Sequence, residues 1–225
     1  MTDLPVVLVH GFATSAARTW GDNGWIDLLH DARRDVVAID MLGHGTADKP
    51  HDPAAYEQLE SLVAAQIPDG PVDAIGFSMG ARVLLTLAAD EPERFAHLVV
   101  AGVGANLFRD DPREVIVNAI GGDAPDDNPA AQYFAGLARQ AGNDRDALVA
   151  CMQSRRPRLD DGRLAKITNP VLVVLGDRDF AGPAEPLVDA LPDARLVSLR
   201  GVDHYATPKD FGFIDAALGF IGASF

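Results

Sequence analysis

The sequence contains a single cysteine, Cys151, among 225 residues. One cysteine cannot form a disulfide within the chain, so the sequence does not have the pattern of a disulfide-stabilised secreted scaffold, and a reducing compartment is expected. Long hydrophobic runs are missing as well. Near the N-terminus the only apolar run covers residues 6–9, which is far too short for a signal peptide or a membrane span. We therefore expect a cytoplasmic protein with no membrane partner.

Positive charge is also scarce, because 19 lysines and arginines face 33 aspartates and glutamates, for a formal net charge of −14. Nucleic acids and anionic membranes bind to clusters of basic side chains, so neither is expected as a partner. Apolar residues, in contrast, make up 48% of the chain. That content is too high for a disordered protein, and over this length it supplies a globular domain with a sizeable core.

Short apolar runs alternate with amphipathic segments along the chain. The runs are rich in valine and isoleucine and are mostly apolar at both odd and even positions, which is typical of strands buried on both faces of a parallel sheet. They cover residues 5–9, 35–39, 72–77, 97–103, 170–175 and 195–199. The segments between them predict helices over residues 25–33, 53–67, 79–90, 183–191 and 208–221. This alternation predicts an α/β fold with a doubly wound, mostly parallel sheet, which binds ligands at the carboxyl ends of its strands.

The interval between the fourth and fifth predicted strands interrupts this alternation. It contains no convincing strand and predicts short helices around residues 112–120, 129–141 and 145–155. We therefore expect residues 1–106 and 170–225 to form the core of the fold. Residues 107–169 are expected to form a helical cap, or lid, inserted over the edge of the sheet.

The sharpest motif is Gly76-Phe77-Ser78-Met79-Gly80, at the junction of a predicted strand and a predicted helix. This is the G-x-S-x-G nucleophile elbow in its strand–turn–helix context. The tight turn exposes the serine hydroxyl above the sheet, and a Cβ at either glycine would collide with the neighbouring strand and helix. The helix N-terminus also places backbone N–H dipoles beside the nucleophile. We expect Ser78 to be a catalytic nucleophile.

A serine nucleophile needs a general base, and after this elbow the acid and then the histidine are expected in chain order. Only His97 and His204 follow Ser78. His97 opens a predicted strand and is expected at its amino end, far from Ser78. His204 follows the last predicted strand, on the side where a base can reach the serine. We therefore expect His204 to be the base.

The acid that orients the base should follow the fifth predicted strand, which runs into Gly176-Asp177-Arg178-Asp179. Asp179 is favoured, because Asp177 lies closer to the strand and is available to hold the turn. Asp203 is next to His204 in sequence, but side chains of adjacent loop residues usually diverge, so it ranks lower.

Two backbone N–H groups are expected to bind the oxyanion. One belongs to Met79, directly after the nucleophile, and the other to Phe12, in the loop after the first predicted strand. Gly11 permits an unusual backbone angle that can aim the Phe12 N–H inward. His10 is a second candidate base, although a role in holding this loop through a hydrogen bond is favoured.

With these residues the chain resembles the α/β-hydrolase superfamily over nearly its whole length. The markers are His10-Gly11-Phe12, residues 40–45, the elbow at Ser78, residues 176–179 and residues 201–204, in the order and at the spacing of the family. The resemblance implies a serine esterase-like enzyme with a helical cap between two sheet strands, the acid at Asp179, and no metal or other cofactor. Many members begin with an antiparallel hairpin that is missing before residue 5, so a homodimer covering that sheet edge is a further expectation.

Basic residues gather near the end of the predicted cap. Arg155, Arg156 and Arg158 are candidate substrate-binding residues that would attract a carboxylate, a phosphopantetheine group or an acidic carrier protein. A solvated surface is the alternative interpretation. Arg82, four residues after Ser78, is expected to lie beneath the site and not in contact with substrate.

The leading functional hypothesis is a serine hydrolase that cleaves a small-molecule carboxylic ester or thioester through Ser78, His204, Asp179 and an acyl-enzyme. The same residues are compatible with C–C bond hydrolysis, with an elimination of the menaquinone-pathway type, or with cofactor-free perhydrolysis. A non-catalytic binding protein with the hydrolase fold is a further alternative, because fold alone does not determine function.

Overall fold

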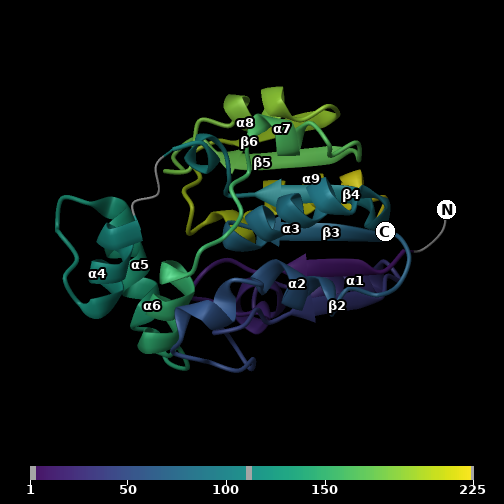
Figure 1. Ribbon diagram of the computed structural model, residues 1–225. Helices are drawn as coiled ribbons and strands as arrows, with labels where there is room; N and C mark the ends of the chain where they lie inside the picture. Colours follow the sequence, from purple (N-terminus) through teal and green to yellow (C-terminus); the bar gives the residue numbers. More distant parts are fainter. Residues whose placement is uncertain (1–3, 110–112, 224–225) are drawn as a thin grey trace.

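The computed structural model describes residues 4–109 and 113–223 and contains a central sheet of six parallel strands (Figure 1). The strand order across the sheet is β2-β1-β3-β4-β5-β6, and each neighbouring pair is parallel. The strands are β1 (Val6–Val9), β2 (Val36–Ile39), β3 (Val72–Phe77), β4 (Phe95–Ala101), β5 (Val171–Gly176) and β6 (Ala194–Leu199). The predicted α/β fold with a doubly wound parallel sheet is thereby confirmed.

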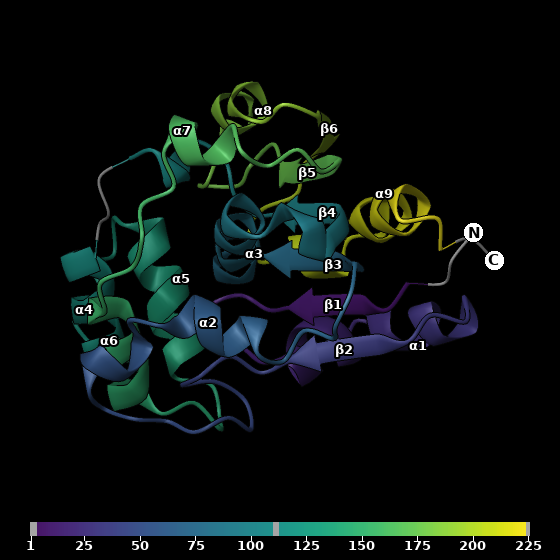
Figure 2. The ribbon, with the colours of Figure 1, turned by 45° about the vertical axis from the view of Figure 1, so that its right-hand side comes forward.

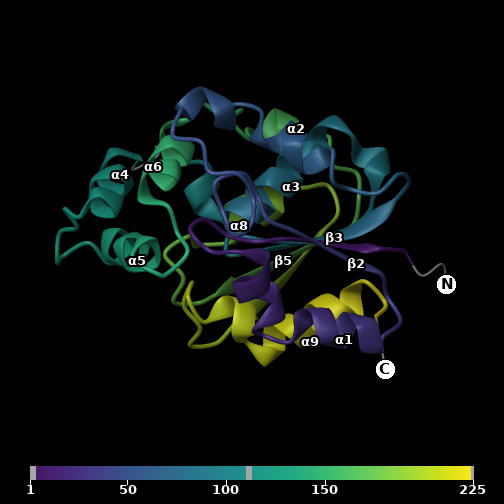
Figure 3. The same ribbon diagram turned by 90° about the horizontal axis from the view of Figure 1, so that it is seen from below.

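Helices cover both faces of the sheet, as the view from below shows most clearly (Figure 3). One face is covered by α1 (Trp25–Asp31) and α9 (Phe211–Phe220), and the other by α2 (Leu59–Ala64), α3 (Met79–Asp90) and α8 (Glu185–Ala190). Successive strand residues point to opposite faces. In β1, Val7 and Val9 therefore belong to the core under α3, whereas Val6 and Leu8 belong to the core under α9.

The direction in which the chain adds strands reverses between β1 and β3. From β1 it moves outward to β2, and then returns to the other side of β1 to add β3 to β6 in order. The loops that follow β1 and β3 therefore leave the sheet in different directions. A crevice at the carboxyl ends of such strands is the usual place for a ligand in this kind of fold.

Three helices lie beyond the carboxyl ends of the strands (Figures 1 and 2): α4 (Arg113–Gly121), α5 (Pro129–Ala138) and α6 (Arg145–Gln153). Side chains at their N-caps start α5 and α6, because Asn128 accepts a hydrogen bond from the Ala131 N–H and Asp144 accepts one from the Ala147 N–H. These helices fall where the sequence predicts them. Pro112, the predicted start of the first, lies outside the described residues.

A fourth helix in the same interval, α7 (Asp161–Leu164), is not predicted from the sequence. It begins at Asp160, whose side chain accepts a hydrogen bond from the Arg163 N–H. It packs against α3, where the Arg163 guanidinium lies 2.6 Å from the Asp90 carboxylate. This part of residues 107–169 thus lies against the sheet layers and not with α4 to α6.

Side chains fasten the α4–α6 group to the loops of the sheet. Arg18 donates from Nη1 to Gln140 Oε1 at 2.9 Å, and Asn143 donates from Nδ2 to the Ala13 carbonyl at 2.8 Å. Both contacts join the loop after β1 to the segment between α5 and α6. Among the described residues, no helix is both long enough and apolar enough to cross a lipid bilayer.

Candidate active site

Ser78 occupies the sharp turn between β3 and α3, with φ +53° and ψ −111°. A side-chain-bearing residue rarely adopts such a conformation, so the surrounding packing must enforce it. A Cβ on Gly76 would lie 2.7 Å from the Ala81 backbone, and a Cβ on Gly80 would lie 2.2 Å from the Val9 carbonyl oxygen. Both glycines are therefore required for α3 to pack this closely on the sheet.

The structure brings Ser78, His204 and Asp179 together. Ser78 Oγ lies 3.0 Å from His204 Nε2, and His204 Nδ1 lies 2.9 and 2.8 Å from the two Asp179 oxygens. The Asp179 carboxylate also accepts a hydrogen bond from the Ala181 N–H at 2.8 Å. Because an ionised carboxylate only accepts hydrogen bonds, Nδ1 carries the proton, and Nε2 is left to accept one from the serine hydroxyl.

The alternative acids and bases lie elsewhere. Asp177 accepts a hydrogen bond from the Gly201 N–H at 2.7 Å and so holds the turn, while Asp203 accepts one from the Ala206 N–H at 2.8 Å. His97 lies within β4, with its Nδ1 2.8 Å from Asp73. None of these side chains is hydrogen-bonded to Ser78 or His204.

The loops that carry the acid and the base interlock through their backbones. The Arg178 N–H donates to the Val202 carbonyl at 3.1 Å, and a Cβ on Gly176 would lie 2.1 Å from that same oxygen. A side chain at position 176 would therefore push the two loops apart. This close approach sets the distance between Asp179 and His204.

Aromatic rings enclose His204, which is only 3% exposed. Its ring centroid lies 4.4 Å from that of Phe180, 4.9 Å from Phe77 and 5.4 Å from Tyr133, which approaches edge-on. Burial, together with the negative charge of Asp179, raises the pKa of the Tyr133 phenol, so that this group stays neutral. The rings exclude water from the imidazole and restrict its orientation.

In the loop after β1, His10 holds the peptide group that carries the Phe12 N–H. His10 Nδ1 donates to the Gly11 carbonyl at 2.6 Å, and His10 Nε2 accepts from the Met41 N–H at 3.1 Å. Burial lowers the pKa of His10, which keeps this ring neutral and able to do both. In a trans amide the C=O and N–H point in opposite directions, so fixing the Gly11 carbonyl also fixes the Phe12 N–H.

The Phe12 and Met79 N–H groups donate to no other group within the described part of the chain. Both residues line the same cavity as Ser78. The next residue in the loop, Ala13, has φ +57°, and its carbonyl accepts the hydrogen bond from Asn143. A side chain from outside the sheet therefore supports the strained part of this loop.

A cavity of about 370 Å³ opens in front of Ser78. Its wall combines apolar side chains with guanidinium groups. The arginines that line it are Arg82, Arg109, Arg113 and Arg156.

Sequence reasoning identified only part of this wall. Of the three arginines predicted to bind substrate, Arg156 lines the cavity, whereas Arg155 and Arg158 are exposed and do not line it. Arg82 was expected beneath the site. It lies in the wall instead, because a residue four positions after Ser78 shares its face of α3.

Arg109 and Arg113 were missed. The sequence offered one indication of their role: both lie at the start of the interval predicted to form the cap, shortly after the fourth predicted strand.

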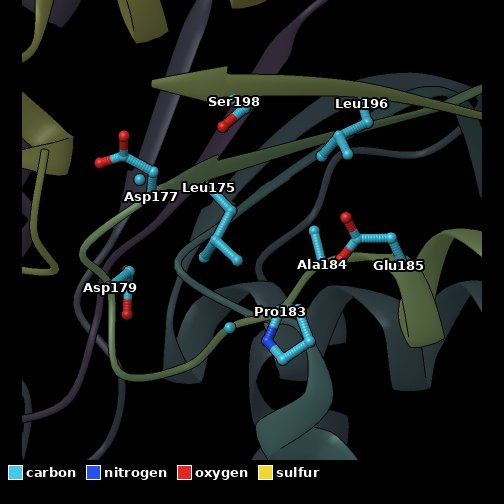
Figure 4. A pocket seen from close by; sticks show the side chains of 10 residues that line it. Leu175, Asp177, Asp179, Pro183, Ala184, Glu185, Leu196 and Ser198 are labelled. Carbon is cyan, nitrogen blue, oxygen red and sulfur yellow. The ribbon is translucent and has the colours of Figure 1, made fainter. Parts of the chain in front are cut away.

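A second cavity of about 320 Å³ lies between β6 and α8, behind the acid loop (Figure 4). Leu175, Leu196 and Ser198 line it from the strands, and the carboxylates of Asp177, Asp179 and Glu185 also border it. No basic side chain contributes to its described wall.

Within the described residues, one group of potential metal ligands lies at the surface: the ligand atoms of His51, Asp144 and Asp146 are within 4.8 Å of one another. His51 Nε2 already lies 3.0 Å from Asp144, and Asp144 caps α6. These contacts account for the cluster as a surface hydrogen-bonding arrangement.

The chain belongs to the alpha/beta hydrolase family, whose sequence profile matches residues 6–214. This establishes the family expected from the motifs, and with it an enzyme of the hydrolase class.

Similar proteins include a pimeloyl-[acyl-carrier protein] methyl ester esterase from Neisseria meningitidis serogroup B, which is 31% identical over 88% of this chain and 85% of its own. A 2-hydroxymuconate semialdehyde hydrolase from Pseudomonas putida is 34% identical over 44% of this chain and 36% of its own. Among solved structures, the serine hydrolase CarC involved in carbazole degradation superposes with a TM-score of 0.73 at 27% identity, covering 98% of this chain and 92% of its own.

Proposed function

We propose that this protein is a serine hydrolase that cleaves carboxylic esters or thioesters through an acyl-enzyme. The observation that carries the proposal is the continuous hydrogen-bonded chain from Ser78 Oγ through His204 to Asp179, in a cavity that Phe12 and Met79 also line. The similarity to a methyl ester esterase over most of both chains supports the same class of reaction.

The proposed reaction begins when His204 Nε2 accepts the Ser78 proton as Oγ attacks the substrate carbonyl. The Phe12 and Met79 N–H groups stabilise the oxyanion, and Asp179 stabilises the imidazolium that forms. His204 then returns its proton to the departing alcohol or thiol. A water molecule, deprotonated by His204, cleaves the acyl-enzyme and releases the acid.

We further propose that the helices α4 to α6, within residues 107–169, form a cap over this site, and that residues 1–106 and 170–225 form the catalytic core. Phe134 of α5, Ile116 of α4 and Met152 of α6 contribute to the wall of the cavity. The cap would thus set the shape of the acyl pocket, while the sheet supplies the reacting groups.

The test is labelling by a fluorophosphonate probe together with turnover of p-nitrophenyl acetate. Wild-type protein should react with the probe and release p-nitrophenol. Ser78→Ala should lose labelling and lower kcat by roughly 10³-fold or more, because the nucleophile is gone. Wild-type protein that does not label, or a Ser78→Ala variant that keeps the wild-type rate, would contradict the proposal.

A second candidate is hydrolysis of a C–C bond by the same residues. The substrate named for the Pseudomonas putida relative contains no ester, and Arg82 in the cavity wall could hold its carboxylate. Parallel assays of esters and vinylogous 1,5-diketones distinguish the two, since only a C–C hydrolase would turn over the diketones at the higher kcat/KM.

A carrier-bound acyl chain is the larger form of substrate that we propose for the ester reaction. The Neisseria relatives are named for an ester of a pimeloyl group on an acyl-carrier protein. Comparing the same acyl ester free and attached to a carrier tests this form, because recognition of the carrier would lower KM without changing kcat.

A further inference from the structure

Four arginines line the cavity in front of Ser78, in a chain whose formal net charge is −14. Its four arginines come from four separate segments: Arg82 from α3, Arg109 from the loop after β4, Arg113 from α4, and Arg156 from the segment after α6. No aspartate or glutamate is found among the described residues that line it. Its apolar wall includes Val103, Leu107, Ile116 and Met152.

Three of these arginines converge on the end of α6. Arg113 donates from Nη1 to the Ser154 carbonyl at 3.0 Å, and Arg156 donates from Nε to the Ser154 hydroxyl at 3.4 Å. Arg82 donates from Nη2 to the Pro157 carbonyl at 3.1 Å. Carbonyl and hydroxyl oxygens near the end of α6 thus orient these guanidinium groups. An arginine has several N–H donors in a planar fork, so one such contact does not exhaust it.

Arg156 is the central residue of this group. It also donates from Nη2 to the Cys151 carbonyl at 3.0 Å, and no carboxylate in the described part of the chain forms a salt bridge with it. Its positive charge reaches the neighbouring His44, where it adds to the lowering of the pKa that burial causes. Burying part of a cation without an acidic partner costs free energy, and a bound anionic ligand would offset that cost.

Arg109 is held at the other side of the cavity. It donates to the carbonyls of Phe180 and Gly182, in the loop that follows Asp179. It too forms no salt bridge within the described residues. Guanidinium groups therefore line the cavity beside the acid loop as well as beside the end of α6.

We propose that the substrate carries a carboxylate in addition to its scissile carbonyl, and that Arg156, with Arg82, Arg109 and Arg113 around it, binds that carboxylate. This inference rests on the proposed ester or thioester hydrolysis and names its substrate class. A cavity of about 370 Å³ accommodates a small molecule with an apolar chain between the two groups. Paired N–H donors of arginine match the two oxygens of a carboxylate in geometry and charge.

The experiment compares two esters of equal chain length, mono-p-nitrophenyl adipate and p-nitrophenyl hexanoate, which differ by a carboxylate in place of a methyl group. Wild-type protein should prefer the adipate ester. Arg156→Gln should lower kcat/KM for the adipate ester roughly ten- to a hundredfold, mainly through KM, because a charge-assisted hydrogen bond is lost. For the hexanoate ester, kcat/KM of Arg156→Gln should stay within about twofold of wild type, because this ester has no carboxylate for Arg156 to bind.

Arg139→Gln is the matched control, since Arg139 is exposed at the end of α5 and does not line the cavity. It should leave both esters unchanged. Arg109→Gln provides a second variant on the opposite side of the cavity, should Arg156→Gln fail to fold. The expected result for Arg109→Gln is the same selective loss for the adipate ester.

Binding without turnover gives an independent readout. In the Ser78→Ala background, calorimetry should find a lower Kd for monomethyl adipate than for methyl hexanoate, and Arg156→Gln should remove the difference. Equal losses for both esters, or no preference in wild-type protein that still labels at Ser78, would overturn this inference alone. Failure of wild-type protein to label would instead overturn the proposed hydrolase reaction.

Discussion

His44 is a fully buried histidine beside the loop that carries Phe12. Its Nδ1 donates to the Leu42 carbonyl at 2.9 Å, and its Nε2 has no hydrogen-bond partner in the described part of the chain. Its ring lies 5.5 Å from the Phe12 ring and 5.3 Å from the His10 ring. Burial, followed by the neighbouring His10, lowers the pKa of His44 to about 3.

This shift predicts a loss of stability on mild acidification. The folded pKa is about 3 and the ordinary value is 6.5, so protons bind preferentially to the unfolded chain between these values. The stabilisation is present above pH 6.5 and is lost as the pH falls towards 3. Between pH 7 and pH 5, His44 alone should lower the free energy of unfolding by about 2 kcal/mol.

Urea denaturation at the two pH values measures this difference. His44→Asn should show a smaller fall than wild type, whatever its stability at pH 7. His51→Asn is the control. Hydrogen bonding to Asp144 raises the pKa of the exposed His51, so the shift has the opposite sign to that of His44, and removing His51 should not make the fall in stability smaller. An unchanged fall in His44→Asn would contradict the assignment to His44.

At the same scale, the sequence predicted that Ser78, Asp179 and His204 lie close together, because each follows the carboxyl end of a predicted strand. The structure places these side chains within hydrogen-bonding distance of one another. Sequence reasoning could not locate Arg109 and Arg113 in the cavity wall. Their approach to Ser78 depends on how the helices after β4 fold back over the sheet, and no local pattern encodes that path.

Among the secondary-structure elements, the elbow between β3 and α3 has the least tolerance for change. A Cβ at Gly80 would meet the Val9 and His10 carbonyl oxygens at 2.2 and 2.5 Å, and backbone atoms cannot move aside as a flexible side chain can. Gly136, inside α5, has nothing within 4 Å of the position a Cβ would take.

Gly80→Ala should therefore lower the free energy of unfolding by roughly 3 kcal/mol or more, or prevent soluble expression, because α3 must move off the sheet. Gly136→Ala should raise it by roughly 0.5 to 1 kcal/mol through lower entropy of the unfolded chain. Thermal denaturation of the two variants beside wild type measures both effects. Similar Tm values for Gly80→Ala and wild type would contradict the packing described for the elbow.

The bounds of the elements were predictable where local signals agree. β3 and α3 begin and end at the predicted residues, since a buried apolar run meets a helix at a glycine-flanked turn. The predicted helix over residues 53–67 is instead divided into a 3₁₀ turn, Pro53–Tyr56, and α2. Gln58 departs from helical geometry between them, with φ −112° and ψ 30°. The apolar periodicity alone did not reveal this break.

At the scale of the whole molecule, a buried ion pair connects Leu4 and Ile221, near the two limits of the described residues, to the sheet. Arg34 forms a salt bridge with Asp73 of β3, and it donates to the carbonyls of Leu4 at 2.8 Å and Ile221 at 3.0 Å. Both charged side chains are almost fully buried. Asp73 also lies 2.8 Å from His97 Nδ1.

Replacing one residue of the Arg34–Asp73 pair should lower the free energy of unfolding more than replacing both. Asp73→Leu leaves a buried guanidinium without its counter-charge, so it should lower the free energy of unfolding by about 3 to 5 kcal/mol. The double variant Arg34→Met with Asp73→Leu should recover part of that loss. Urea denaturation of both single variants and the double variant measures the coupling, and strictly additive losses would contradict it.

Net charge is a property of the whole molecule that sequence composition gives directly, yet it is a poor guide to the cavity. Residues 107–169 carry almost as many basic as acidic residues, so nearly all of the −14 lies outside them. Composition gives the acidic balance of the chain as a whole. It did not reveal that Arg82, Arg109, Arg113 and Arg156 point into one cavity, because that depends on the tertiary arrangement.

The most direct test of the proposed reaction is to trap the acyl-enzyme. Wild-type protein mixed with a slowly deacylating p-nitrophenyl ester should release a burst of p-nitrophenol about equal in amount to the enzyme. Quenched in acid at that moment and digested, it should carry the acyl mass on the peptide that contains Ser78. Two results would contradict the account. One is an adduct on another residue. The other is turnover of the ester by both wild type and Ser78→Ala, with no burst and no adduct in either.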